Sequence, residues 1–192
     1  MRYYSTRDNT LRITASEAVK MGLSRDGGLL TPEAIPQIDE AFLRSLMDAG
    51  YQTRAAKVMA LYLTDYSEEE LLGFANNAYG PDKFDHPAAA PPRKVDGNTY
   101  CLELWHGPTC AFKDMALQLL PKLLPAAARK SGCGKEIAIL VATSGDTGKA
   151  ALEGFRDVPG TRIQVFYPQE GVSPMQKRQM TTQQGGNVAV MG

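Results

Sequence analysis

The stretch EIAILVATSGDTGKAAL, residues 136–152, contains the two elements that decide the fold of this chain. The continuous apolar run IAILVA, residues 137–142, predicts a β-strand that is buried on both faces. A glycine-containing turn, SGDTG, follows, and the sequence KAALEGFRD, residues 149–157, then predicts a helix. A strand that passes through a tight turn into a helix is typical of a parallel sheet with crossover helices.

The same alternation of strand and helix continues to the end of the chain. A strand is predicted at residues 161–168, a helix at 173–185 and a third strand at 187–192. A parallel sheet normally continues from such a strand into a helix that covers it. We therefore expect this chain to be the amino-terminal part of a longer protein. A short sheet capped by a helical domain is the alternative.

Upstream of residue 136 the sequence predicts one more strand and one interrupted helix. TYCLELWH, residues 99–106, has the composition of a strand, and residues 114–132 have the pattern of a helix. Pro121 and Pro125 should kink that helix or break it early, because proline cannot donate a backbone hydrogen bond.

The first half of the chain reads as mainly helical. Thr14 or Ser16 can cap the first helix, and Thr14 and Glu17 have the spacing of a capping box. Ser67 is a suitable N-cap for a later helix. Glycines and prolines make the intervening segment 25–36 a loop. The helices are predicted at residues 14–23, 40–50, 51–63 and 67–80.

The proline- and alanine-rich segment 85–98 has little periodicity, and it marks the boundary between two domains. We expect residues 1–90 to form a small helical domain and residues 91–192 to be the first part of an α/β region.

Composition excludes several functional classes. Lysine plus arginine equals aspartate plus glutamate at 21 each, so an extended nucleic-acid or anionic-membrane surface is not indicated, although a local basic patch stays open. No apolar run reaches the roughly 20 residues of a membrane helix, and the first ten residues lack the apolar core of a secretion signal. Three cysteines and two histidines form no metal-binding spacing. A cytoplasmic protein with reduced thiols is expected.

Lys113 is the residue that most needs an explanation. It follows Phe112 within HGPTCAFKDMAL, residues 106–117, and Thr109 is the expected N-cap of the helix that follows. Lys113 would then lie in the first turn, where the free backbone amides and burial against Phe112 disfavour the ammonium form. A neutral amine in a pocket can condense with an aldehyde. The alternative is a lysine whose stem packs while its head reaches water.

The sequence HGPTCAFKDMAL resembles the lysine motif of threonine synthases, which are fold-type II pyridoxal-phosphate enzymes. The segments 22–36 and 167–192 resemble the same family, so the resemblance spans nearly the whole chain. It implies that Lys113 carries pyridoxal 5′-phosphate covalently, with Phe112 beside it. It also implies the fold class: α/β, with a small mainly helical amino-terminal domain and part of a three-layer α/β/α domain with a parallel sheet.

The turn VATSGDTGKAAL, residues 141–152, supports this resemblance independently. Such a turn can present amides and hydroxyls to an anion at a helix N-terminus. In the family this loop embraces the substrate carboxylate, which assigns Ser144, Gly145 and Thr147 to substrate binding. Asp146 would approach the cofactor ring, but a carboxylate should repel the substrate anion, and its role stays open.

A P-loop of nucleotide hydrolases is the rival interpretation of this turn. Thr143 occupies the position of its first glycine, and Ala150 replaces the hydroxyl residue that would hold magnesium. Lys149 is then expected to be a solvated lysine of the first helical turn.

The resemblance implies the conversion of O-phosphohomoserine and water to L-threonine and phosphate. The alternatives are another fold-type II lyase, such as a dehydratase acting on a hydroxy or phosphorylated amino acid, and a non-catalytic binding relic. The family's glycine-rich loop for the cofactor phosphate and its partner for the pyridine nitrogen have no candidates in these residues. We therefore expect the isolated 192-residue chain to bind cofactor poorly and to be inactive.

Overall fold

The computed structural model describes residues 1–192, which form two compact units. The first unit contains Met1–Asn77 and Ala126–Gly134, and the second contains Ala78–Pro125 and Lys135–Gly192. Packing thus divides the chain after Asn77, and a later segment returns to the first unit. The two packed units do not test the domain boundary that we expect at residue 90, which stays a prediction.

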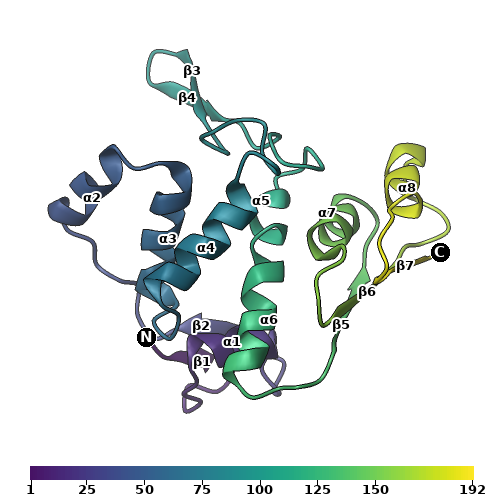
Figure 1. Ribbon diagram of the computed structural model, residues 1–192, viewed down its shortest axis with the longest axis horizontal. Helices are drawn as coiled ribbons and strands as arrows, with labels where there is room; N and C mark the ends of the chain where they lie inside the picture. The colour runs from purple at the N-terminus through teal and green to yellow at the C-terminus, as the bar shows by residue number, and fades with distance from the viewer. The chain divides into compact units, whose positions relative to one another are not determined.

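The first unit is mainly helical, as predicted. Two three-residue strands pair in antiparallel fashion, with Tyr4 opposite Thr31. Both were missed from the sequence, because three residues are too few to show an alternating pattern. The elements of this part are β1 (Tyr3–Ser5), α1 (Ala15–Met21), β2 (Leu30–Pro32), α2 (Glu40–Met47), α3 (Tyr51–Tyr62) and α4 (Glu68–Tyr79) (Figure 1).

Both predicted helix starts are confirmed by reciprocal capping bonds. Thr14 Oγ1 accepts from the Glu17 amide at 3.2 Å, while a Glu17 carboxylate oxygen accepts from the Thr14 amide at 2.7 Å. Ser67 and Glu70 repeat this arrangement at the start of α4, with distances of 3.1 and 2.8 Å. Each pair satisfies two amides that the helix itself leaves without an acceptor.

The second unit opens with an antiparallel hairpin formed by β3 (Pro92–Asp96) and β4 (Thr99–Leu102). The strand predicted at residues 99–106 is therefore present but shorter. Strand β3 lies within the segment 85–98, where the sequence showed little periodicity and no strand was predicted. Pro92 is tolerated as the first residue of this exposed strand, where its missing N–H costs no ladder bond.

The interrupted helix is present as two helices, α5 (Asp114–Leu117) and α6 (Leu120–Lys130). Pro121 lies in the first turn of α6, where an amide would lack an intrahelical acceptor, so the chain breaks just before it. Pro125 lies inside α6 without ending the helix. None of the helices combines the length and the apolar character that crossing a membrane requires.

The remaining elements form the predicted parallel sheet. Its strands are β5 (Ile137–Ala142), β6 (Thr161–Phe166) and β7 (Val188–Met191), which pair in the order β5-β6-β7. The crossovers contain α7 (Asp146–Phe155) and α8 (Pro174–Thr181), and Ser173 caps α8 through the amide of Gln176. The α/β fold class predicted for this part of the chain is confirmed (Figure 1).

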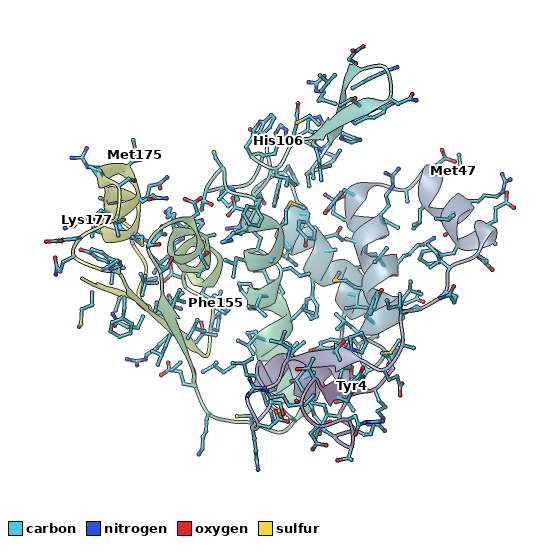
Figure 2. The ribbon with its side chains drawn as sticks, turned by 180° about the vertical axis from the view of Figure 1, so that it is seen from behind. Tyr4, Met47, His106, Phe155, Met175 and Lys177 are labelled. Carbon is cyan, nitrogen blue, oxygen red and sulfur yellow. The ribbon has the colours of Figure 1, made fainter.

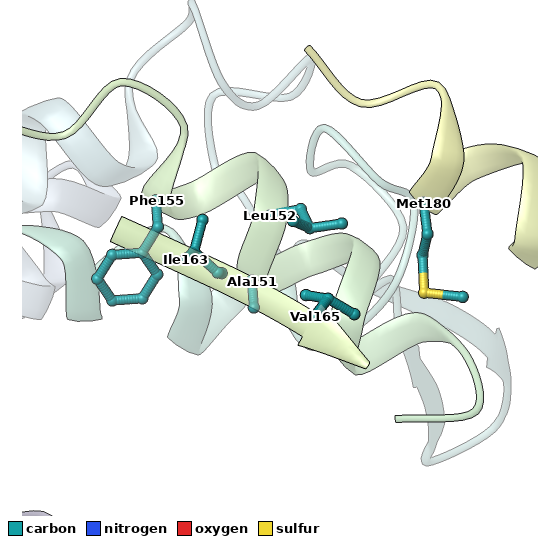
Figure 3. Close-up of a cluster of buried hydrophobic side chains, with 6 residues drawn as sticks. All are labelled: Ala151, Leu152, Phe155, Ile163, Val165 and Met180. Atoms are coloured by element: carbon teal, nitrogen blue, oxygen red, sulfur yellow. The ribbon is translucent and has the colours of Figure 1, made fainter. Parts of the chain in front are cut away.

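One face of the sheet packs against α7 and α8. The core side chains are Ala151, Leu152 and Phe155 of α7, Ile163 and Val165 of β6, and Met180 of α8 (Figure 3). On β5 half-buried residues alternate with exposed ones, and Leu140 is 72% exposed. The prediction that β5 is buried on both faces is therefore wrong for this chain: Ala138, Leu140 and Ala142 of β5 are exposed on the face that no other element covers.

Gly154 of α7 tests the close contact between α5 and α7. A Cβ atom at this position would lie 1.9 Å from the Leu117 carbonyl oxygen and 3.3 Å from Pro121. Gly154→Ala should therefore lower the free energy of unfolding by about 1–3 kcal/mol in urea denaturation, because backbone must move. Gly73→Ala in α4 is the control. With no atom within 4 Å of its Cβ position, it should be neutral or stabilise by about 0.5–1 kcal/mol. Equal effects of the two changes would contradict the close packing.

Candidate active site

The lysine loop, residues 106–113, is folded around one buried carboxylate. Asp114 is 1% exposed, and its two oxygens accept from the Thr109 amide at 2.8 Å and from Thr109 Oγ1 at 2.7 Å. The prediction that Thr109 caps the helix is therefore wrong. Helix α5 begins at Asp114, and Lys113 occupies the N-cap position. Lys113 consequently lies just before the first turn of α5 rather than within it.

Gly107 and Asp114 are in direct contact. A Cβ atom on Gly107 would lie 2.6 Å from both Cβ and Oδ2 of Asp114, so only glycine fits opposite this carboxylate. Burial raises the pKa of Asp114, and its bonds from Thr109 oppose that rise by stabilising the charged form. Tyr79 Oη donates to the Met115 carbonyl at 2.8 Å, which holds the following helix from another side.

The amine of Lys113 contacts an aromatic ring and no polar group. Its Nζ lies 4.1 Å from the centroid of the Phe112 ring, as the sequence suggested, and it makes no hydrogen bond or ion pair. The side chain of Lys113 is half-buried, but Phe112 itself is 59% exposed. The expected ring contact is therefore present, whereas the deep burial expected from Phe112 is absent.

The second motif lies at the carboxyl end of β5, where Gly145 is the N-cap of α7. Thr143 Oγ1 accepts from the amides of Gly145 and Gly148 at 3.2 and 3.3 Å. A Cβ atom on Gly148 would lie 2.2 Å from Thr143 Cγ2, so glycine permits this approach. Two amides that we expected to face an anion are thus bound within the turn, while Ser144 is exposed and Thr147 is half-buried.

Asp146 has a partner that the sequence did not reveal. Gln176 Nε2, from the first turn of α8, donates to Asp146 Oδ1 at 2.9 Å, and Ser173 Oγ lies 3.0 Å from Gln176 Oε1. A Cβ atom on Gly145 would lie 2.6 Å from Gln176 Nε2. The spacing of Ser173 and Gln176 is that of a capping box, and this was the available signal that Gln176 is held in place.

Lys149 is not the solvated lysine that the sequence led us to expect. It is half-buried, its Nζ contacts Gln183 Oε1, and burial lowers its pKa. Gln183 Nε2 donates in turn to Glu153 Oε2 at 3.0 Å. These contacts give Lys149 a role in holding α7 to the segment that follows α8, which is different from the phosphate-binding role of a P-loop lysine.

His106, at the start of the lysine loop, bridges two carboxylates. Its Nδ1 lies 2.6 Å from Asp85 Oδ1 and its Nε2 lies 2.8 Å from Glu103 Oε2. Arg93 binds the other oxygen of Glu103 at 3.1 Å. The bonds to Glu103 and Asp85 raise the pKa of His106. Figure 2 shows His106 beneath the β3–β4 hairpin, where sequence reasoning had assigned it no separate role.

The two motifs are joined by the helices that follow them. α5 follows Lys113 and α7 follows the 144–148 turn, and the two helices touch where Gly154 meets the Leu117 carbonyl. A lysine with a free amine and a turn at the carboxyl end of a parallel strand thus belong to one packed unit.

Comparison with known proteins identifies the family. The family model described as "Threonine synthase N terminus" matches residues 2–79. Threonine synthase from Pseudomonas aeruginosa is 40% identical over 189 residues, which cover 98% of this chain and 39% of that protein. The chain belongs to the threonine synthase family.

Other threonine synthases agree with this assignment. The one from Schizosaccharomyces pombe is 38% identical over 97% of this chain and 37% of its own length. A crystal structure described as PLP-bound threonine synthase from Brucella melitensis superposes with a TM-score of 0.90, at 38% identity, over 99% of this chain and 40% of that one. Yeast threonine synthase gives a TM-score of 0.89 at 34% identity, over 100% of this chain and 40% of that one. The chain spans about two fifths of the length of these relatives.

The bond from Thr109 to Asp114 can be tested by removing one hydroxyl. Thr109→Val keeps the shape of the side chain but leaves a buried carboxylate oxygen without its donor, and it should cost about 1.5–3 kcal/mol of unfolding free energy. Thr109→Ser retains the hydroxyl and should cost much less. Urea denaturation of the three proteins gives the comparison, and a valine variant as stable as the serine variant would contradict this role for Asp114.

The bond between Asp146 and Gln176 is suited to a double-mutant cycle. Asp146→Ala and Gln176→Ala should be less destabilising together than the sum of the two, with a coupling free energy of about 0.5–1.5 kcal/mol measured in urea. Asp146→Asn is the control, because its amide oxygen can still accept from Gln176. Additive effects would show that the two side chains do not depend on each other.

Proposed function

We propose that this chain acts as part of a threonine synthase, which converts O-phosphohomoserine and water to L-threonine and phosphate with pyridoxal 5′-phosphate. The unpaired amine of Lys113, within a motif that resembles the family's lysine motif, is the observation that carries this proposal. Supporting it is the similarity to threonine synthases over 98% of the chain, one of which is described with PLP bound.

The residues of the lysine loop fit the cofactor. An amine without a hydrogen bond or ion pair can condense with the aldehyde of pyridoxal phosphate without first breaking another interaction. When bound, this cofactor supplies an electron sink for carbanions next to the amino-acid nitrogen. Lys113 would hold it, Phe112 would lie beside it, and Asp146 would approach its ring at the end of β5.

Lys113 would also move protons once its amine is released. A primary amine at the end of a loop that Asp114 holds in place is suited to take and return a proton at the alpha and beta carbons of the substrate. Gln176 donates a hydrogen bond to one carboxylate oxygen of Asp146. This bond would reduce the repulsion between the Asp146 carboxylate and a bound anion.

The turn at residues 144–148 would bind the substrate carboxylate. The exposed Ser144 hydroxyl and the half-buried Thr147 can donate to it, and the N-terminal end of α7 favours negative charge. Gly145 would let the substrate approach the backbone closely. Its amide would not bind the substrate, because that amide already donates to Thr143. The other partners follow the same proposal: a small-molecule substrate, no nucleic acid, no membrane, and a cytoplasmic location.

Lys113→Ala tests the role of the amine. Pyridoxal phosphate is added to the protein encoded by the complete coding sequence, the adduct is reduced with borohydride, and the labelled peptide is identified by mass spectrometry. The label should lie on Lys113 and be absent from Lys113→Ala, while Lys94→Ala, on the exposed strand β3, should keep it. A label on another lysine would refute the proposal.

The same preparation separates the competing activities. Threonine synthase activity releases threonine and phosphate from O-phosphohomoserine, whereas a related fold-type II dehydratase yields 2-oxobutyrate, and a binding relic yields neither. We propose further that the 192-residue polypeptide alone binds the cofactor poorly and is therefore inactive. A tight, Lys113-dependent absorbance band on titrating it with pyridoxal phosphate would contradict that part of the proposal.

A further inference from the structure

His106 joins two segments that meet at the start of the lysine loop. The Asp85 amide donates to the His106 carbonyl at 3.1 Å, and the Asp85 carboxylate binds the ring of the same residue at 2.6 Å. The other ring nitrogen binds Glu103, which directly follows β4, at 2.8 Å. With 13% of its side chain exposed, His106 is fixed by three bonds to groups on two different segments.

A short series of contacts leads from His106 to Lys113. Gly107, the next residue, accepts from the Cys110 amide at 3.1 Å and lies against Asp114. Thr109 then donates twice to Asp114, which is the neighbour of Lys113. The loop is therefore held at its start by His106 and at its end by Asp114, with only a few residues between these two points.

The bridge at His106 requires a positive charge. An ionised carboxylate only accepts hydrogen bonds, and a neutral imidazole has a single N–H to donate. Two ring nitrogens that each lie within 2.8 Å of a carboxylate oxygen are satisfied together only by the imidazolium form. Loss of the proton would place a nitrogen lone pair against a carboxylate oxygen, and one of the two bonds would break.

We propose that His106 is a positioning residue for Lys113: its protonated ring ties Asp85 to Glu103 and thereby fixes the loop that holds the Lys113 amine over Phe112. This inference rests on the proposed function for the importance of that amine, but the bridge itself can be tested without cofactor or substrate.

The surroundings of His106 determine how the bridge responds to pH. Asp85 and Glu103 face the ring as charges, and Arg93 binds the far oxygen of Glu103. The rings of His86 and Trp105 lie 5.0 and 5.6 Å away between centroids. His86 Nδ1 accepts from the Ala88 amide at 3.1 Å.

The sign of the pH effect follows from these bonds. Glu103 and then Asp85 raise the pKa of His106 above its ordinary value of 6.5. A group whose pKa is higher in the folded protein contributes stability that is complete below its unfolded pKa and is lost as the pH rises through the folded one. The bridge should therefore be closed in mildly acidic solution and should open on the alkaline side of 6.5.

The experiment is a pH titration, by nuclear magnetic resonance, of the protein encoded by the complete coding sequence without cofactor. The chemical shifts of the His106 ring nitrogens report the protonation of that ring. The chemical shift of the Lys113 ε-methylene protons reports the position of the lysine side chain, because the nearby Phe112 ring changes that shift. We expect the effect of the Phe112 ring on the Lys113 chemical shift to be lost at the pH at which His106 deprotonates, above 6.5. Lys177, whose Nζ lies 5.6 Å from the Tyr167 ring centroid, is the control and should show no change at that pH.

Variants separate positioning from general folding. Asp85→Asn and Glu103→Gln each remove one negative charge next to the His106 ring. The midpoint of the His106 titration and the midpoint of the change in the Lys113 chemical shift should therefore move together to lower pH. His106→Gln should lose the ring effect on the Lys113 chemical shift at every pH while Lys177 keeps its own. The proposal is overturned if the Lys113 signal of the unaltered chain is unchanged through the His106 titration, or if His106 titrates at 6.5 or below.

Failure of this inference is distinguishable from failure of the proposed function. If borohydride labels Lys113 but the Lys113 chemical shift does not change as His106 titrates, only the positioning role is wrong. If the two signals titrate together but no lysine is labelled, the bridge exists and the assigned chemistry is wrong.

Discussion

The buried carboxylate of Asp114 is the constraint on which the lysine loop depends. A charge removed from water needs donors, and Thr109 supplies both of them from five residues upstream, so the chain between them must close into a tight loop. The loop closes fully only because Gly107 has no side chain to separate it from Asp114. The position of the Lys113 amine therefore depends on the next residue in the motif, Asp114. The side chain of Asp114 is buried, whereas that of Lys113 is only half-buried.

Sequence reasoning succeeded where a local pattern controls the structure. The capping pair Thr14 and Glu17 fixed the first helix, and the alternation of strand and helix after residue 136 fixed the parallel sheet. It failed where the outcome depends on contacts between distant residues. Thr109 looked like a helix cap, because Ser and Thr usually serve that role, and the competing bond to a buried carboxylate cannot be read from spacing alone.

The candidate site shows the same division. Phe112 and Lys113 lie in contact as their adjacency suggested, and the 144–148 turn ends a strand as predicted. The partner of Asp146, in contrast, lies 30 residues away at Gln176, and Thr143 draws two glycine amides inward. A motif thus indicates which residues matter, whereas the direction in which each group points depends on side-chain contacts, some within the motif and some far from it in the sequence.

The bare face of the parallel sheet has a consequence for handling the polypeptide. Leu140, Phe166 and Met191 all lie exposed on strands whose other side is packed. Large apolar side chains that are exposed on a sheet lower solubility and favour self-association in water. These three side chains should therefore add to any tendency of the purified chain, whose positive and negative charges balance, to associate at high concentration.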